Sequence, residues 1–170
     1  RAGAEDGRET PAGEVGELWL RGPHVSKGYW NNPEATAAAL DADGWFHTGD
    51  LAVRHGDGCY EVVGRSKELI ISGGENVHPA EIENLVAAFP GVAECAVVGL
   101  SDPRWGEVPA LVLVPRPGQR VDERALQSLF DQRLARFKHP RRIVVAEALP
   151  KTALGKVRRA ALAATLQRLS

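Results

Sequence analysis

The chain has 170 residues, of which 44% are hydrophobic and 25% are charged, and its formal net charge at pH 7 is -1. This balance is typical of a folded globular protein and excludes an intrinsically disordered one. The near-zero net charge argues against a general nucleic-acid binder, and no apolar stretch approaches the roughly 20 residues that a membrane span requires. The length is enough for one medium-sized domain or two small ones.

The first third of the sequence predicts a small, β-rich block. We expect a strand over residues 17–21, a helix over 33–40 and a strand over 59–63. Asn32 and Pro33 begin the helix, because asparagine caps helix starts and proline fits the first turn. Residues 44–51 are expected to form a polar turn, and Asp57-Gly58 is typical of a hairpin.

After residues 64–68 the pattern changes to an alternation of strands and helices. We expect strands over 69–72, 92–100, 108–114 and 143–146, and helices over 80–87, 123–135 and 157–169. The helices are predicted by apolar side chains at helical spacing, with Pro79 and Asp122 at two of the starts. The sequence therefore predicts an α+β domain whose three- or four-stranded sheet is packed by helices.

The sequence shows no pattern for a protein-built metal site. Its five histidines do not cluster, and its two cysteines, Cys59 and Cys95, lack metal-ligand spacing. Both cysteines lie in apolar, strand-like runs. We therefore expect buried free thiols in a reducing compartment.

Two loops that combine glycine with lysine are the most informative feature of the chain. They are residues 64–75 (GRSKELIISGGE) and 150–156 (PKTALGK). Glycine lets a backbone approach a phosphate or carboxylate closely, and lysine supplies positive charge. By composition alone, Lys156 fits a lysine that extends into a neighbouring site and a solvated lysine equally well. Gly73-Gly74 likewise fits either a ligand-binding loop or a plain hairpin turn.

A third polar segment, Thr48-Gly49-Asp50, is expected to be a tight turn that ends in a carboxylate. Such a carboxylate can accept hydrogen bonds from the two hydroxyls of a ribose. The alternative is that Asp50 only closes its own turn. Arg65 could hold a phosphate or ribose oxygen with its planar fork of donors, or lie on an ordinary surface loop.

Residues 133–170 concentrate positive charge, with ten lysines and arginines against one acid, Glu147. This excess suggests an anionic ligand, and the alternative is a solvated helix face. Within it, Phe137 lies beside cations and could stack an adenine while they pair with a phosphate. The alternative is a helix end whose cations meet the helix dipole while Phe137 joins the core.

Seven segments, taken in order, resemble the C-terminal part of the adenylate-forming superfamily. They are GELWLRG, KGYWNNPEAT, GWFHTGDLA, GRSKELIISGGENVHPAEIE, VAECAVVGLSDPRWGE, FKHP and LPKTALGKVRR. The superfamily includes acyl- and aryl-CoA ligases, adenylation domains of peptide synthetases, and luciferases. GGENVHPAEIE together with DPRWGE most resembles the acyl- and aryl-CoA ligases, such as those for benzoates.

The resemblance implies a two-step ligase whose substrates are a carboxylic acid, Mg-ATP and coenzyme A. The carboxylate attacks the α-phosphorus of ATP to give acyl-AMP and pyrophosphate, and the thiol of CoA then displaces AMP. The small C-terminal domain rotates between the steps. A cytoplasmic enzyme of fatty or aromatic acid metabolism is implied. A peptide-synthetase-type adenylation domain, a luciferase-like oxidase and a non-catalytic interaction module are the alternatives.

The resemblance also implies a domain organisation. Residues 1–66 correspond to the β-rich end of the large N-terminal AMP-binding domain, and residues 67–170 to the mobile C-terminal domain. The phosphate loop, the magnesium-binding acid and the acyl pocket of the family belong to the missing part of the N-terminal domain. We therefore expect the 170 residues to be a fragment that is inactive by itself.

Site residues follow from the resemblance position by position. Lys156 corresponds to the catalytic lysine of adenylation, Asp50 to the residue that binds the ribose hydroxyls, and Arg65 to a second nucleotide contact. Lys67 corresponds to the hinge, where many members have aspartate. The positions expected along the pantetheine channel are Ser72, Gly73, Gly74 and Trp105, and those near the CoA nucleotide are Phe137, His139 and Arg141.

Overall fold

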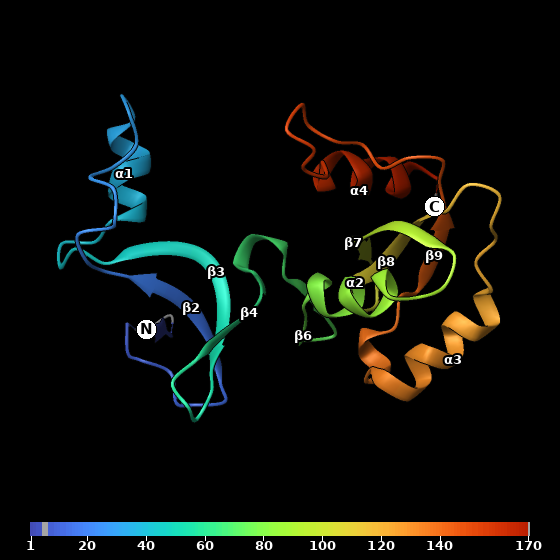
Figure 1. The fold of residues 1–170 in the computed structure, drawn as a ribbon, viewed down its shortest axis with the longest axis horizontal. Coiled ribbons are helices and arrows are strands. Elements are labelled where there is room, and N and C mark those ends of the chain that lie inside the picture. Colours follow the sequence, from blue (N-terminus) through green and yellow to red (C-terminus); the bar gives the residue numbers. More distant parts are fainter. Residues whose placement is uncertain (5–6, 170) are drawn as a thin grey trace. The chain divides into compact units, whose positions relative to one another are not determined.

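The structure, a computed structural model, describes residues 1–4 and 7–169. The chain divides into two compact units, Arg1–Lys67 and Glu68–Ser170 (Figure 1). The boundary predicted from the sequence follows residue 66. In the structure the two units divide one residue later, so that Lys67 ends the first unit.

The first unit is built on a four-stranded antiparallel sheet in the order β1-β2-β3-β4. Its strands are β1 (Ala2–Gly3), β2 (Val15–Leu20), β3 (Phe46–Arg54) and β4 (Tyr60–Arg65). Its helix, α1 (Pro33–Ala39), begins as predicted, because Asn32 caps it by accepting a hydrogen bond from the Ala35 amide at 3.0 Å.

The expected turn over residues 44–51 is wrong, because most of that segment belongs to β3. This strand lies between β2 and β4 and pairs with both, so ladder hydrogen bonds on two sides outweigh the local turn preference. A trace of the turn remains at Gly49, which has a φ of +72°. The register of β3 against β4 also shifts between Leu51 and Ala52. Glycine is needed at position 49, because other residues rarely adopt a positive φ.

The second unit contains a five-stranded sheet in the order β6-β5-β8-β7, with β9 also paired to β8. Its strands are β5 (Ile70–Ser72), β6 (Glu75–Val77), β7 (Val92–Asp102), β8 (Gly106–Pro115) and β9 (Arg142–Val145). Among the described residues of this unit, β8–β9 is the one parallel pair. The α+β class is confirmed, but the predicted three or four strands omitted β6. This three-residue strand is too short to show a period and returns directly from the Gly73-Gly74 turn.

Helices cover both faces of this sheet (Figure 1). The unit contains α2 (Pro79–Ala87), α3 (Glu123–Arg133), α4 (Arg159–Arg168) and the 3-10 turn η2 (Arg136–Lys138). A further 3-10 turn, η1 (Ser66–Glu68), spans the boundary between the two units. Ile82 of α2 and Phe130 of α3 pack in a core with Val97 of β7. Leu162 of α4 packs in a second core with Ala96. Neighbouring residues of β7 thus enter opposite cores, as strand geometry requires.

The expectation of two buried thiols is wrong for Cys59, which is exposed. The strand begins one residue later than predicted, at Tyr60, so Cys59 falls in the hairpin turn. Cys95 is half-buried, and burial raises the pKa of its thiol to about 11. None of the helices in the described part of the chain is long and apolar enough to cross a membrane.

Candidate active-site surfaces

Lys156 lies in a short turn between β9 and α4 that is closed by its own hydrogen bonds. Lys151 and Val157 form an antiparallel bridge, and the Thr152 amide donates to the Lys156 carbonyl at 2.8 Å. Gly155 has a φ of +81°, and its amide donates to the Thr152 carbonyl at 2.9 Å. The Thr152 hydroxyl accepts from the Lys156 amide at 3.2 Å. These bonds hold the Lys156 backbone while its side chain remains exposed.

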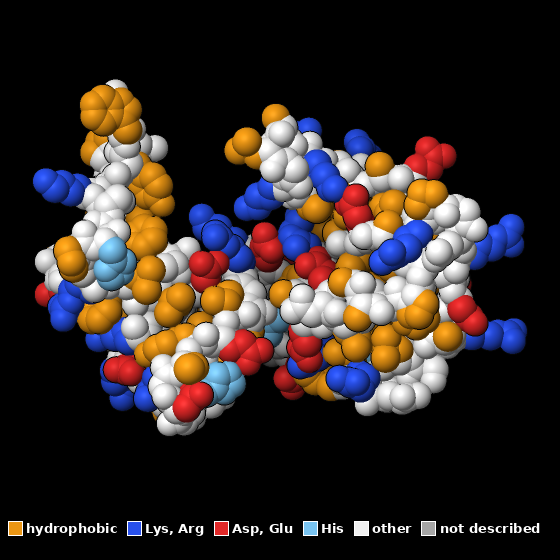
Figure 2. Space-filling view, viewed as in Figure 1, with side chains coloured by type: hydrophobic (Ala, Val, Ile, Leu, Met, Phe, Trp, Pro, Cys, Tyr) orange, Lys and Arg blue, Asp and Glu red, His pale blue; other side chains and the backbone are white. Residues whose placement is uncertain are grey.

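The two lysines of this turn differ in their partners. Lys151 Nζ lies 2.5 Å from Glu94 Oε2 on β7. In the part of the chain that the structure describes, no polar group pairs with the Lys156 ammonium. Lys and Arg side chains gather at this turn before α4 (Figure 2). An unpaired ammonium on a hydrogen-bonded backbone is available to an anionic ligand, whereas the Lys151 charge is already neutralised.

Asp50 and Arg65, the two predicted nucleotide contacts, lie opposite each other on β3 and β4. Arg65 Nε is 2.7 Å from Asp50 Oδ1, and both side chains are partly exposed. The Asp50 carboxylate is thus directed across the strand pair toward Arg65, while the backbone amide of Asp50 donates to the Thr48 hydroxyl at 3.0 Å. The pair can offer a carboxylate and a guanidinium side by side to a ribose and its phosphate.

A cavity of about 640 Å³ opens beside Arg65 in the first unit. It is lined by residues of β2, α1, β3, β4 and η1, with Arg65, Ser66 and Lys67 along one wall. Two further lining residues, Glu17 and His47, were not predicted as site residues from the sequence. The sequence gives little indication of a role for Glu17, because a polar residue in an alternating strand is expected to point outward into solvent.

Glu17 fixes the backbone next to Asp50. Its Oε1 accepts from the Gly49 amide at 2.8 Å, and its Oε2 accepts from Trp19 Nε1 at 2.8 Å and lies 3.2 Å from His47 Nδ1. Burial by itself would raise the pKa of Glu17, but the hydrogen bonds from Trp19, Gly49 and His47 lower it below the ordinary value. Glu17 is therefore held as a carboxylate that anchors the bulged part of β3.

Gly73 and Trp105, two of the predicted pantetheine positions, are in direct contact. The Gly73 amide donates to the Trp105 carbonyl at 2.8 Å, and a Cβ on Gly73 would lie 2.7 Å from Trp105 Cε3. Gly73 also has a φ of +62°. Ser72 is buried and pairs with Gly106 beside this contact, and Gly74 continues the turn with a φ of +86°. Only glycine fits the Trp105 ring at position 73.

Of the three residues predicted near the CoA nucleotide, Arg141 joins the Trp105 surface. Its guanidinium lies 5.8 Å from the centroid of the Trp105 ring. His139 points toward α3, where its Nε2 lies 3.2 Å from the Leu134 carbonyl oxygen. Arg141 and His139 nevertheless line one cavity of about 410 Å³. The structure therefore places Arg141 at the surface and turns His139 inward.

Phe137 neither ends a helix nor joins the core. Helix α3 ends at Arg133, and Phe137 lies in η2 with 36% of its surface exposed. The neighbouring Lys138 Nζ is 5.7 Å from the centre of the Phe137 ring and is paired with Glu81 at 2.7 Å. The exposed ring remains available for stacking, but the adjacent cation is already engaged.

Two candidate surfaces lie at opposite ends of the β7–β8 hairpin. One is the turn that contains Lys156, and the other is the Trp105 surface, which is formed by Gly73, Trp105 and Arg141. The turn is tied to Glu94 near the start of β7, whereas Trp105 follows Asp102 at its end. The nine residues from Glu94 to Asp102 span about 25 Å in an extended strand. Lys156 and Trp105 therefore face different regions of space, and one reacting group cannot touch both at once.

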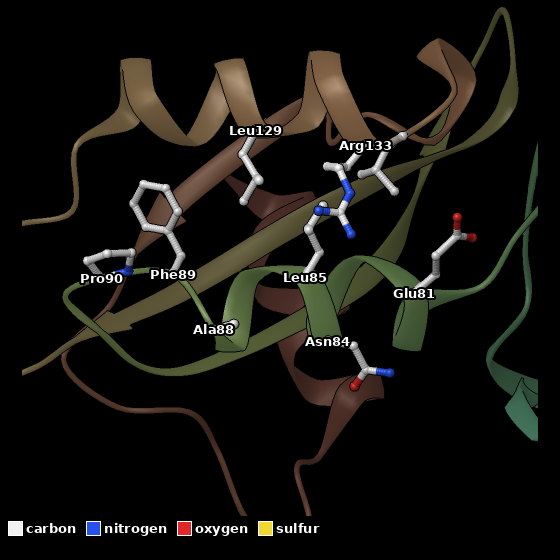
Figure 3. Close-up of a pocket in the computed structure, with 9 residues that line it drawn as sticks. Glu81, Asn84, Leu85, Ala88, Phe89, Pro90, Leu129 and Arg133 are labelled. Carbon is white, nitrogen blue, oxygen red and sulfur yellow. The ribbon is translucent and has the colours of Figure 1, made fainter.

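A further cavity of about 590 Å³ lies between α2 and α3 (Figure 3). Leu85, Phe89 and Leu129 form its apolar wall, and Glu81 and Arg133 lie on its rim. None of the predicted site residues lines it. Among the described residues, no group of three or more His, Cys, Asp or Glu side chains is placed to hold a metal ion.

Part of the second unit matches a known protein family. Residues 81–156 match the family described as AMP-binding enzyme C-terminal domain. A feruloyl-CoA synthase from an Amycolatopsis species is 50% identical over 92% of this chain and 32% of its own length. An indoleacetate–CoA ligase from Aromatoleum aromaticum is 50% identical over 91% of this chain and 30% of its own.

The same relation holds among solved structures. The o-succinylbenzoate CoA synthetase from Bacillus subtilis, solved in complex with the acyl-adenylate intermediate, superimposes with a TM-score of 0.89 at 38% identity. The match covers 95% of this chain and 33% of that protein. The chain thus spans about a third of the length of the relatives it matches.

Proposed function

This chain contains the C-terminal domain of the AMP-binding, adenylate-forming enzymes, and we propose that it is the C-terminal part of an acyl- or aryl-CoA ligase. The names of the relatives, with ferulate, indoleacetate and succinylbenzoate as acids, favour an aromatic carboxylic acid as substrate. The other substrates are ATP and coenzyme A, both of which are available in the cytoplasm, where we place the enzyme.

The reaction has two steps. In the first, a carboxylate oxygen attacks the α-phosphorus of ATP, and pyrophosphate leaves. In the second, the sulfur of CoA attacks the acyl carbon of acyl-AMP, and AMP leaves. We propose that ATP reacts as its Mg²⁺ complex.

The separation of Lys156 from Trp105 is the observation that supports this function most directly. Two ligand-facing surfaces at opposite ends of one hairpin can both serve the same reacting group if the second unit presents first one and then the other to it. Lys67 is the last residue of the first unit and lies in η1, a single short turn. We propose that rotation near Lys67 exchanges the two surfaces between the steps.

Each surface then has a chemical role. Asp50 and Arg65 bind the ribose and phosphate of the nucleotide, while the Lys156 ammonium stabilises the negative charge that develops as carboxylate and α-phosphate meet. In the second step, the backbone at Gly73 and the Trp105 ring border the pantetheine chain. Arg141, above Trp105, can pair with a phosphate of CoA.

The test uses the full-length protein with a panel of acids: ferulate, indoleacetate, 2-succinylbenzoate and a long-chain fatty acid. We expect acid-dependent exchange of pyrophosphate into ATP, and a CoA thioester with release of AMP, with an aromatic acid preferred. Absence of exchange with every acid would contradict adenylation. Exchange followed by loading of a carrier-protein thiol, with CoA inert, would favour the peptide-synthetase alternative.

A further inference from the structure

Arg159, the first residue of α4, is the centre of an ion-paired cluster at the edge of the sheet. Its Nη1 and Nη2 donate to the two carboxylate oxygens of Glu83 on α2, at 2.5 and 2.9 Å. Both side chains are largely buried, with 26% and 17% of their surface exposed. This bidentate geometry gives a strong charge-assisted pair, and hydrogen bonding to Glu83 raises the pKa of Arg159 although burial opposes it.

The cluster also satisfies the backbone of an edge strand. In the sheet order β7 is the outermost strand, so some of its backbone groups face away from β8. The Val97 amide donates to Glu83 Oε1 at 2.7 Å, and the Val97 carbonyl accepts from Arg159 Nη1 at 2.8 Å. Since α2 and α4 lie on opposite faces of the sheet, the pair joins the two helices around its edge.

A third contact connects this cluster to the start of the second unit. Arg159 Nε lies 2.9 Å from Oε2 of Glu68, the residue that directly follows Lys67. The guanidinium therefore uses all three of its nitrogens. A lysine has one nitrogen and could not bridge Glu68 and both Glu83 oxygens with the same geometry.

The same cluster holds one end of the turn that contains Lys156. Arg159 lies three residues after Lys156, and the Arg158 amide closes the turn by donating to the Pro150 carbonyl at 2.8 Å. The other end is held by the pair of Lys151 with Glu94. Both ends are thus tied by charged side chains, directly or through Glu83, to the same strand, β7.

We propose that Arg159 is the positioning residue of Lys156: with Glu83 and Glu68, it fixes the Lys156 turn to the segment where the second unit begins. The proposal rests on the proposed function, in which Lys156 acts in adenylation. Because adenylation needs the ammonium within a fraction of an ångström of its place, a loosened turn slows that step. The CoA step uses the other end of the hairpin and is spared.

The first test is Arg159→Lys in the full-length protein, which keeps the charge and removes the fork. We expect the kcat of acid-dependent pyrophosphate exchange to fall about 10- to 100-fold, with the KM for ATP changed less than about threefold. Thioester formation from supplied acyl-AMP stays near the wild-type rate. Equal loss in both half-reactions, or unchanged exchange, would overturn the proposal.

Glu81→Gln is the matched control. Glu81 lies two residues before Glu83 on α2 and also forms an ion pair, with Lys138, but that pair does not reach α4. We expect this variant to keep the adenylation rate. Should Arg159→Lys fail to fold by circular dichroism, Glu68→Gln removes only the 2.9 Å contact, and a several-fold loss confined to adenylation is expected. Wild-type adenylation in Glu68→Gln would then count against the proposal.

A second measurement does not depend on activity. The amides of Thr152 and Arg158 are hydrogen-bonded across the turn, so their hydrogen exchange reports its opening. We expect these amides to exchange about tenfold faster in Arg159→Lys than in the wild type or Glu81→Gln. Unchanged exchange would refute the positioning role. An inactive wild-type protein would instead contradict the proposed function, while this comparison still decides the role of Arg159.

Discussion

At the scale of single residues, Lys151 and Lys156 show how neighbouring groups leave only one of two similar side chains available to a ligand. They lie five residues apart in one turn, yet Glu94 neutralises Lys151 while no described polar group pairs with Lys156. The sequence could place both lysines in a glycine-containing loop. It could not separate them, because Glu94 is distant in sequence and meets Lys151 only in the fold.

Lys156→Ala should therefore abolish most adenylation in the full-length protein. Loss of a positive charge at the transition state is expected to slow pyrophosphate exchange by about 10²- to 10³-fold. Lys151→Ala removes a partly exposed ion pair and should cost less than about fivefold. Thioester formation from supplied acyl-AMP should survive in both variants. If Lys156→Ala slowed both half-reactions equally, its assigned role would be wrong.

Gly73→Ala and Gly74→Ala form a second informative pair at this scale. Both glycines have positive φ values, so both substitutions cost about 1 kcal/mol of backbone strain. Only at Gly73 would the new Cβ collide with the Trp105 ring, since nothing lies within 4 Å of a Cβ on Gly74. We expect the KM for CoA to rise at least about tenfold more in Gly73→Ala, with adenylation intact. Equal KM values for CoA in the two variants would show that the contact between Gly73 and Trp105 does not contribute to CoA binding.

At the scale of elements, the start of α3 offers a direct test of local sequence rules. The Asp122 carboxylate accepts from the amides of Arg124 and Ala125 at 2.9 and 3.1 Å, and α3 buries Phe130 completely. Asp122→Ala should lower the free energy of unfolding by about 1 kcal/mol, measured by urea denaturation. Asp122→Asn keeps an acceptor and should lie within a few tenths of a kcal/mol of the wild type. A neutral Asp122→Ala would show that the cap does not stabilise α3.

Elements with local signals were predicted well from the sequence, and elements that depend on distant partners were not. The caps at Asn32 and Asp122 and the Asp57-Gly58 hairpin depend on neighbouring residues, and each appears in the structure. Strand β3 was missed because its pairing with β2 and β4 overrides the turn chemistry of Gly49. The same difference applies to the site residues. Asp50 and Arg65 could be predicted from sequence motifs, whereas Glu17 and Arg159 could not, because they act through contacts with residues distant in the sequence.

At the scale of the whole molecule, the proposed alternation depends on Lys67. Lys67→Pro fixes φ at that residue and restricts Ser66 before it, so rotation near the boundary of the units should be hindered. We expect pyrophosphate exchange to persist while CoA thioester formation collapses. Lys67→Ala, which leaves φ free, should retain both steps. Unimpaired overall turnover in Lys67→Pro would show that rotation does not pivot at this residue.

In the proposed function, the β7–β8 hairpin fixes the separation between the two surfaces that act in the two chemical steps. Its length sets the distance between the Lys156 turn and Trp105, and hence how far the second unit would have to move if it presents the two surfaces in turn. Inserting one residue into β7 without a bulge would exchange Ala96 and Val97 between the two cores, so single-residue changes in this distance are disfavoured. Without a new bulge, the distance changes by two residues at a time, matched in β8, in increments of about 7 Å. Homologues that retain both surfaces should therefore differ in hairpin length by even numbers or not at all.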